Sequence, residues 1–257
     1  MIPQLVPLDG RIPAWDKTLF VERGCPFCQS EGADRYIRPD GLRIRSCPIC
    51  RCYFVSPSPT EDLLAEFYAA YYAQHRAVEL RQYRDDAVLV KEMTMVQPQT
   101  DPKMNCLTSL MDFRGKRVLD IGFGLGQNLL LMRKLGAEVT GIDLDPDSVH
   151  FVRNVLGIER VYHGDVGDLP STERFDLITL HDVIEHPLEP LQLLRSAKRL
   201  LAEGGLLSLW TPNASSVDEE RQPITFRVDL EHMQYLTFDT MRYLAVTLAS
   251  WPCKASF

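Results

Sequence analysis

The sequence lacks any apolar run approaching the ~20 residues that a membrane-spanning helix needs. Its first residues, MIPQLVPLDGR, also lack the basic stretch and apolar core that mark a secretory signal. These two absences argue against a membrane protein and against a secreted one. We therefore expect the chain to work in the cytoplasm, without a membrane span.

Basic residues are fewer than acidic ones. Lys and Arg number 28 against 35 Asp and Glu, which gives a formal net charge of −7. Binding to nucleic acid or to an anionic membrane surface needs a basic face, so neither is the expected role. With 45% hydrophobic and 25% charged residues, the composition is that of a globular protein. A small molecule is the expected partner.

The seven cysteines are clustered, with five of them between residues 25 and 52. An odd number without a secretory signal argues against a disulfide framework. Two CxxC pairs, CPFC and CPIC, have eighteen residues between them, which is the spacing of a four-thiolate zinc site. Because the protein would fill all four positions, we expect a structural zinc ion. Its predicted ligands are Cys25, Cys28, Cys47 and Cys50.

Other interpretations of this cluster stay open. The thiols could be buried or redox-active without a metal, and Cys52 could replace Cys50 as a ligand. The segment 23–52 has six Arg and three acidic residues, a net charge of +3, so a zinc ribbon here could also grip nucleic acid. We favour a scaffold role, because zinc replaces the hydrophobic core that so small a unit cannot build.

From residue 115 onward, short apolar segments alternate with helical patterns. This alternation predicts an α/β fold with a doubly wound, mostly parallel Rossmann-like sheet that binds ligands at the carboxyl ends of its strands. The expected strands are 117–121, 138–142, 160–163, 175–180 and 205–210, and the expected helices are 127–135, 146–156 and 187–201. Residues 57–114 look mostly helical, with a break at 96–102.

A glycine-rich turn, VLDIGFGLG, follows the first of these strands. Gly122, Gly124 and Gly126 let the backbone approach a ligand closely, and the next helix begins with free amides. The spacing is GxGxG, and not the GxGxxG of dinucleotide-binding proteins, which disfavours a nicotinamide dehydrogenase. Asp120 would repel a pyrophosphate, but it suits a ligand that carries an ammonium group.

Two further carboxylates end the next strands. Asp143 ends the second strand, where a carboxylate can accept hydrogen bonds from both hydroxyls of a ribose. Asp165 ends the third strand and can accept a hydrogen bond from an adenine amino group. Each of them could be an ordinary loop carboxylate, but their succession at one edge of the sheet favours a nucleoside site.

Residues 115–213 resemble the core of the class I S-adenosylmethionine-dependent methyltransferases. The matching motifs are VLDIGFGLG, VTGIDLDP, HGDVGDLP, FDLITLHDVIEHPLEP and LLAEGGLLSLWTPN. CPICRCYFVSPSPTEDLLAEFYAAYY is similar to the zinc-binding entry segment of bacterial methyltransferases that act on sugars, nucleotide-linked sugars and polysaccharides, and EHMQYLTFDTMRYL is similar to their Glu-His segment.

The resemblance implies S-adenosylmethionine as cofactor and zinc as a structural metal. Asp120 and the three glycines would hold the methionine end, Asp143 the ribose and Asp165 the adenine. Leu144, Val166 and His181 are expected beside the same cofactor. The implied acceptor is a small hydroxylated molecule of the sugar, nucleotide-sugar or glycan type, methylated on oxygen or carbon.

Methyl transfer to a hydroxyl or a carbon acid needs a proton acceptor, and histidine suits that task near neutral pH. The resemblance assigns it to His232 together with Glu231, although His232 could instead only cap or pack the following helix. His181, at the end of the fourth strand, is the second candidate for a catalytic contact, whereas His186 is expected to be structural. Tyr72, in an aromatic cluster with Tyr68 and Tyr71, is a weaker candidate for a cofactor or sugar contact, because such stripes are more often core.

The resemblance divides the chain into a zinc-ribbon segment at 1–56, a helical entry or lid segment at 57–114 and the cofactor-binding domain at 115–257. The usual fold ends in two more strands, which the sequence after the helix at 237–249 lacks except for at most one short strand. Three explanations stay open: a naturally short protein, a truncated gene, or a second copy or partner chain that completes the sheet. Two alternative functions stay open: an RNA or protein methyltransferase guided by the zinc ribbon, and an inactive cofactor-binding assembly partner.

Overall fold

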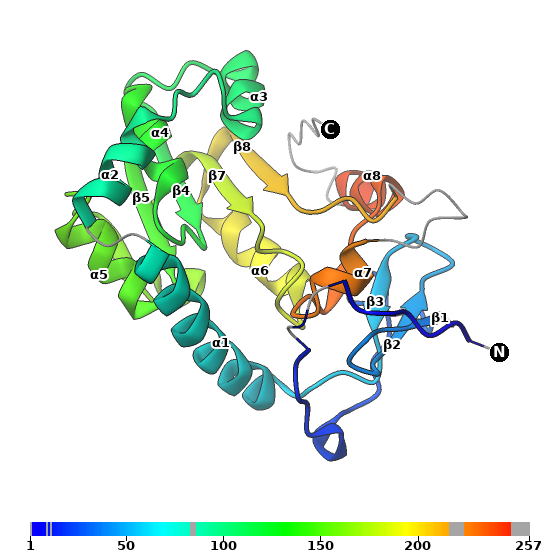
Figure 1. The fold of residues 1–257 in the computed structure, drawn as a ribbon. Helices are drawn as coiled ribbons and strands as arrows, with labels where there is room; N and C mark the ends of the chain where they lie inside the picture. Colours follow the sequence, from blue (N-terminus) through cyan, green and yellow to red (C-terminus); the bar gives the residue numbers. More distant parts are fainter. Residues whose placement is uncertain (1, 9, 11, 83–85, 216–223, 248–257) are drawn as a thin grey trace. The chain divides into compact units, whose positions relative to one another are not determined.

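A computed structural model of the chain describes residues 2–8, 10, 12–82, 86–215 and 224–247 (Figure 1). Side chains are described for these residues except 72–82 and 86. The chain divides into two compact units, each drawn from separate stretches of sequence. We call them the cysteine unit (Met1–Glu66, Asp182–Leu194 and Thr211–Ala255) and the sheet unit (Phe67–His181, Arg195–Trp210 and Ser256–Phe257).

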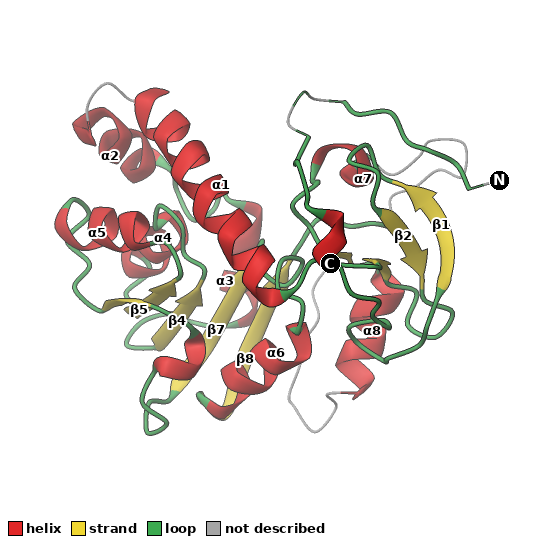
Figure 2. Ribbon diagram, turned by 90° about the horizontal axis from the view of Figure 1, so that it is seen from below, coloured by secondary structure: helices red, strands yellow, loops and turns green. Residues whose placement is uncertain are grey.

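The sheet unit contains five parallel strands in the order β6-β5-β4-β7-β8 (Figures 1 and 2). They are β4 (Arg117–Ile121), β5 (Glu138–Asp143), β6 (Val161–His163), β7 (Phe175–His181) and β8 (Leu201–Trp210). The order reverses after β6, because β7 lies on the other side of β4. This reversal places the end of β4 at the switch point where open α/β sheets bind ligands. The predicted fold class is confirmed.

Two helices directly precede β4: α2 (Asp86–Met95) and α3 (Pro102–Leu110). The helices between the strands are α4 (Gln127–Lys134), α5 (Pro146–Asn154), η2 (Val166–Asp168) and α6 (Pro190–Arg199). The helices α4 and α5 lie on the same face of the sheet (Figure 2). The helix α5 begins where the sequence predicts, because the Asp145 carboxylate accepts from the amides of its first turn and Pro146 needs no partner there. No helix of the described part is both long and apolar enough to cross a membrane.

Two predicted boundaries on either side of β8 are wrong. The helix expected at 187–201 occupies only Pro190–Arg199, since Pro190, and not Pro187, takes its first position. The strand expected at 205–210 begins at Leu201, which pairs with Phe175. Its two glycines, Gly204 and Gly205, lie inside the strand at a shift in register, so they do not mark its start.

The cysteine unit contains a four-stranded antiparallel sheet in the order β1-β2-β3-β9. Three strands come from the predicted zinc-ribbon segment: β1 (Ala33–Ile37), β2 (Arg43–Ser46) and β3 (Tyr53–Val55). The fourth, β9 (Gln234–Tyr235), comes from near the other end of the sequence and was not predicted. The remaining elements that begin here are η1 (Lys17–Leu19), α1 (Glu61–Gln82), α7 (Thr225–Val228) and α8 (Phe238–Thr247).

The segment boundaries predicted after residues 56 and 114 stay a prediction, since each compact unit draws on several stretches of sequence. The helix expected at 237–249 is present as α8. Among the described residues, β8 forms one edge of the parallel sheet, and β9 pairs with β3 of the other sheet. Residues 248–257, and with them Cys253 and the expected absence of the last strands, lie outside the described residues.

Within the cysteine unit, the fully buried Arg38 binds residues that lie 192 and 194 positions away in the sequence. The Arg38 guanidinium binds the Asp40 carboxylate through two nitrogens and donates to the backbone oxygens of Leu230 and His232, each at 2.6 Å. It also donates to the Tyr235 hydroxyl at 2.9 Å. A buried ion pair is tolerated only when its remaining donors are satisfied, and the 230–235 segment supplies those acceptors.

The first prediction concerns this ion pair. Replacing Arg38 by Met leaves the buried Asp40 carboxylate without its cation, so the free energy of unfolding should fall by about 3–5 kcal/mol. Arg43→Met is the matched control, because its side chain is 53% exposed and its partner is Asp34. That change should cost less than about 1 kcal/mol. Urea titration of the three proteins measures both losses, and similar losses would contradict the assigned role of Arg38.

Candidate active site and metal centre

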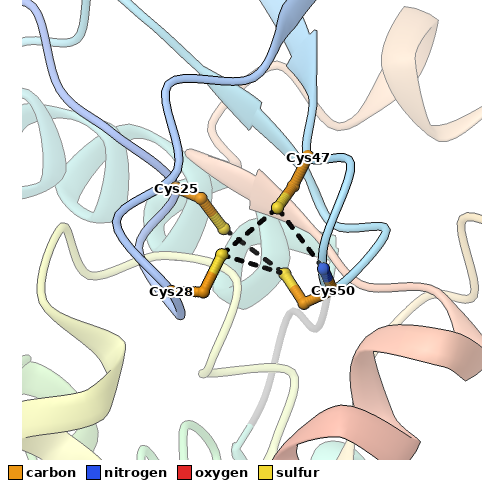
Figure 3. Close-up of side chains that lie close together, drawn as sticks. All are labelled: Cys25, Cys28, Cys47 and Cys50. Carbon is orange, nitrogen blue, oxygen red and sulfur yellow. Dashed lines mark hydrogen bonds between the residues drawn. The ribbon is translucent and has the colours of Figure 1, made fainter.

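The sulfur atoms of Cys25, Cys28, Cys47 and Cys50 all lie within 4.8 Å of one another and point toward a common centre (Figure 3). The Cys25 and Cys50 sulfurs are 3.4 Å apart, and the Cys28 and Cys47 sulfurs are 3.3 Å apart. Tetrahedral zinc with Zn–S bonds of about 2.3 Å needs sulfurs roughly 3.8 Å apart. Small movements of the side chains would reach that geometry, so the four residues fit a structural zinc ion.

Each cysteine pair lies in a tight turn of the same kind. The backbone amide of Gln29 donates to the Cys25 carbonyl at 2.8 Å, and that of Arg51 donates to the Cys47 carbonyl at 3.2 Å. Both donors have left-handed backbones, with φ of 62° and 61°. The amides of residues 49 and 50 also donate to the Cys47 sulfur, each at 3.4 Å. Such N–H donors stabilise a thiolate, as a metal ligand requires.

Cys52 is not part of this group. Its buried thiol donates to the Tyr53 carbonyl at 3.1 Å and lies 3.6 Å from the Tyr235 carbonyl, which belongs to β9. The distances therefore favour Cys50 over Cys52 as the fourth ligand.

The glycine turn follows β4 in the sheet unit. Gly122, Gly124 and Gly126 all have positive φ, of 70°, 55° and 82°, a conformation that other residues rarely adopt. A Cβ atom on Gly126 would also lie 2.7 Å from Cγ2 of Val152. The turn thus needs glycine for backbone conformation and for packing. The helix α4 begins directly after this turn, and its N-cap residue, Gly126, has no side chain to accept hydrogen bonds from the first amides.

Asp120 lies at the end of β4 and is 1% exposed. Its Oδ1 accepts a hydrogen bond from the Thr179 hydroxyl at 2.6 Å, whereas its Oδ2 has no partner. Burial raises the pKa of Asp120 to about 7, and the negative charge of Asp143 adds to that shift. A cation beside Oδ2 would remove this penalty, which agrees with a ligand that carries an ammonium group.

Asp143 ends β5 and holds the glycine turn in place. One carboxylate oxygen accepts from the Gly124 amide at 2.8 Å, and the other accepts from the Asp145 amide at 2.8 Å. Each oxygen has a further lone pair with which it can accept from a ribose hydroxyl. The neighbouring Leu144 is 66% exposed, so its side chain is available to contact a ligand.

Asp165 is exposed and caps the short helix η2. Its side chain accepts from the Gly167 amide at 2.8 Å, while the Asp168 carboxylate accepts from the Asp165 amide at 2.9 Å. This capping box fixes the turn after β6. Val166, expected beside the adenine, is 2% exposed in the structure. The adenine-binding role of both residues stays a prediction.

His181 ends β7, and both of its ring nitrogens have partners. Asn128 Nδ2 lies 3.3 Å from Nδ1, and because an amide nitrogen can only donate, Nε2 carries the proton and donates to the Ser208 hydroxyl at 3.0 Å. Burial lowers the pKa of His181 to about 3, and the charge of Lys103 adds to the shift. The ring is therefore neutral and fully hydrogen-bonded, which suits a contact residue better than a proton acceptor.

In the cysteine unit, His232 lies among acidic and imidazole side chains. Ligand atoms of Glu185, His186 and His232 are within 4.8 Å of one another, and the same holds for Asp229, Glu231 and His232. The two imidazole rings pack edge to face, with centroids 4.8 Å apart. The predicted Glu231 therefore does lie near His232, in a partly exposed position.

Sequence reasoning missed two residues of this cluster, Asp229 and the more deeply buried Glu185. The Glu185 side chain is 1% exposed, its Oε1 lies 3.9 Å from Nε2 of His232, and neither of its carboxylate oxygens has a hydrogen-bond partner. The only signal was its place next to His186, which was expected to be structural. Pairing across 47 positions could not be read from the sequence. The side chain of Tyr72 lies outside the described residues.

The second prediction uses Asp120. Because its pKa in the folded protein lies above the usual value of about 3.9, the folded state binds the proton more tightly than the unfolded state does. The free energy of unfolding without ligand should therefore fall as the pH rises from about 4 to 7, by at most ~1.4 kcal/mol per pH unit.

Denaturant titrations of the wild type and Asp120→Asn at pH 5 and pH 7.5 measure this effect. The Asn variant should lose that part of the pH dependence. Asp147→Asn, at an exposed position of α5, is the control and should keep it. Equal pH dependence in all three proteins would show that Asp120 ionises normally.

Comparisons with known proteins agree with this arrangement. The family model described as "Methyltransferase domain" matches residues 101–245, more than half of the chain. The chain is 34% identical over 141 residues to a protein of Xanthomonas oryzae pv. oryzae named "Ubiquinone biosynthesis O-methyltransferase", covering 52% of this chain and 56% of that protein. A protein of the same name from Glaesserella parasuis is 39% identical over 112 residues, covering 40% and 48%.

The chain thus spans about half the length of the curated relatives it matches. Among solved structures, it is similar to the plantazolicin methyltransferase BpumL in complex with a monoazolic desmethylPZN analog and SAH. That similarity has a TM-score of 0.50 at 20% identity and covers 73% of this chain and 74% of the other, so it concerns the fold alone. The family match decides the assignment: this chain belongs to the methyltransferase-domain family.

Proposed function

We propose that the chain is an S-adenosylmethionine-dependent methyltransferase that acts on a small hydroxylated acceptor. The observation that carries this proposal is the arrangement after β4 and β5: a left-handed glycine turn, bound by Asp143, next to the buried and half-satisfied Asp120. Family membership supports the reaction class.

The residues at this edge fit the proposed cofactor. S-adenosylmethionine supplies a methyl group that is already activated on a sulfonium sulfur. Asp120 offers an unpartnered carboxylate oxygen to an ammonium group, and Asp143 offers lone pairs to ribose hydroxyls. The amides at the start of α4, which have no side-chain cap, would receive the methionine carboxylate. These contacts orient the methyl group for in-line transfer, which is the main task left to the protein.

For the acceptor, we propose a hydroxyl group on a small molecule. The names of the relatives support methylation of oxygen. The cysteine-rich entry segment supports a sugar, nucleotide-sugar or glycan building block as the acceptor class, through its resemblance to zinc-containing methyltransferases of sugars. His232 is the proposed proton acceptor, whereas the two hydrogen bonds of His181 suit a positioning role at the edge of the sheet.

The third prediction tests cofactor binding. Asp143→Ala removes the carboxylate that accepts from the Gly124 amide and from the proposed ribose, so the Kd for S-adenosylmethionine should rise at least 100-fold. Two charge-assisted hydrogen bonds at about 1.5 kcal/mol each account for that factor. Calorimetric titration of the zinc-loaded protein measures it, with NAD as a ligand that should not bind. Asp147→Ala, on the exposed side of α5, should bind like the wild type.

A well-folded wild-type protein that binds no S-adenosylmethionine would overturn the proposed function. Binding of NAD with similar affinity would instead favour a dinucleotide enzyme.

The fourth prediction tests the metal centre, which we propose to be zinc held by Cys25, Cys28, Cys47 and Cys50. The Cys47→Ser protein should lose zinc and become sensitive to proteolysis within residues 23–56, because the metal replaces a core in so small a segment. Cys106→Ser, in α3 of the sheet unit, should keep both zinc and protease resistance. Elemental analysis and limited proteolysis give the two readouts, and an unchanged zinc content in Cys47→Ser would rule out this ligand set.

A further inference from the structure

Backbone contacts within the cysteine unit bring Glu185 and His232 together. The Glu185 carbonyl accepts from the amides of Met233 and Gln234, at 2.9 and 3.3 Å. The Gln234 side chain, which is fully buried, donates to the carbonyls of Ile184 and Pro187, at 2.8 and 2.7 Å. These four bonds fix the segment after β7 against the segment that carries His232, so the short distance between the two side chains is built into the backbone.

The Glu185 side chain is a buried polar group that its surroundings do not satisfy. Both oxygens lack hydrogen-bond partners, and the nearby Thr211 hydroxyl lacks one as well. A buried carboxyl without partners is costly, so its presence needs a reason. Its Oε1 lies 3.9 Å from Nε2 of His232, a gap that a small rotation of either side chain would close to a hydrogen bond.

We propose that Glu185 and His232 form one proton-holding pair, in which Glu185, and not the adjacent Glu231, is the carboxyl partner that positions the His232 ring. Its use in catalysis rests on the proposed function. In the proposed reaction the acceptor oxygen would bond to the methyl carbon, the electrons of the broken sulfur–carbon bond would stay on sulfur, and the pair would take the O–H proton. Glu185 acts through His232 and is a positioning residue.

The charges around the pair support this pairing. Burial raises the pKa of Glu185 to about 8, and the carboxylates of Asp182 and Asp229 add to the shift, whereas the Thr211 hydroxyl opposes it. Burial lowers the pKa of His232, as do the neighbouring His186 and Arg38. Near pH 7 the pair therefore holds one proton, on Glu185. The pair can accept a proton once Glu185 has ionised, as the pH rises past about 8.

The fifth prediction follows the His232 ring by NMR in zinc-loaded protein labelled with ¹³C-histidine, without cofactor or acceptor. His232→Gln identifies the resonance. The wild type should show a change in the His232 ring shifts with a midpoint near pH 8, caused by ionisation of Glu185. Glu185→Gln, which keeps the shape of the side chain, should abolish the change. Glu231→Gln is the matched control and should retain it.

Persistence of the change in Glu185→Gln, its absence from the wild type, or its loss in Glu231→Gln would each overturn the pair. So would a second equivalent of zinc that shifts the His186 and His232 resonances, since the cluster would then be a metal site. If Glu185→Gln fails to fold, Glu185→Asp is the alternative variant. It retains a carboxyl group, so the His232 ring shifts should still change with pH, but with a different midpoint. Because the readout needs no cofactor, its failure is distinct from a failure to bind S-adenosylmethionine.

Discussion

The cysteine unit depends on the burial of the Arg38 guanidinium. This side chain is fully buried and binds Asp40 on its own hairpin, while its other N–H groups reach two backbone carbonyls and one hydroxyl of the 230–235 segment. A buried guanidinium must satisfy its donors, so the hairpin between β1 and β2 and the segment around His232 are ordered together. The segment that Arg38 binds also contains His232 and β9, which pairs with β3.

Each unit contains a buried carboxyl whose pKa is raised by burial: Asp120 in the sheet unit and Glu185 in the cysteine unit. Asp120 keeps one hydrogen bond, from Thr179, and leaves one oxygen without a partner. The Glu185 carboxyl has no hydrogen-bond partner for either oxygen and lies 3.9 Å from an imidazole nitrogen. In each case desolvation favours the protonated acid, and a cation or a proton acceptor would restore the charged form. Both groups therefore respond to what binds beside them.

Sequence reasoning succeeded where the pattern is local. The five strands, the glycine turn and the paired cysteines each depend on residues a few positions apart, and the structure contains all of them. It failed where distant residues decide: the strand β9, and the approach of Glu185 to His232, need contacts across 180 and 47 positions. The start of α6 was missed for a smaller reason, since two prolines competed for its first turn. The site roles of the remaining residues stay predictions.

The path of the chain has a consequence for how the molecule can be taken apart. The cysteine unit is made of three stretches of sequence, and the sheet unit fills the intervals between them. No single cut in the sequence can separate the two, and removing residues 1–56 would leave β9 without the strand it pairs with. The zinc-ribbon segment at 1–56 is therefore not a detachable module. Exchanging it between related enzymes requires exchanging the stretches at 182–194 and 211–247 with it.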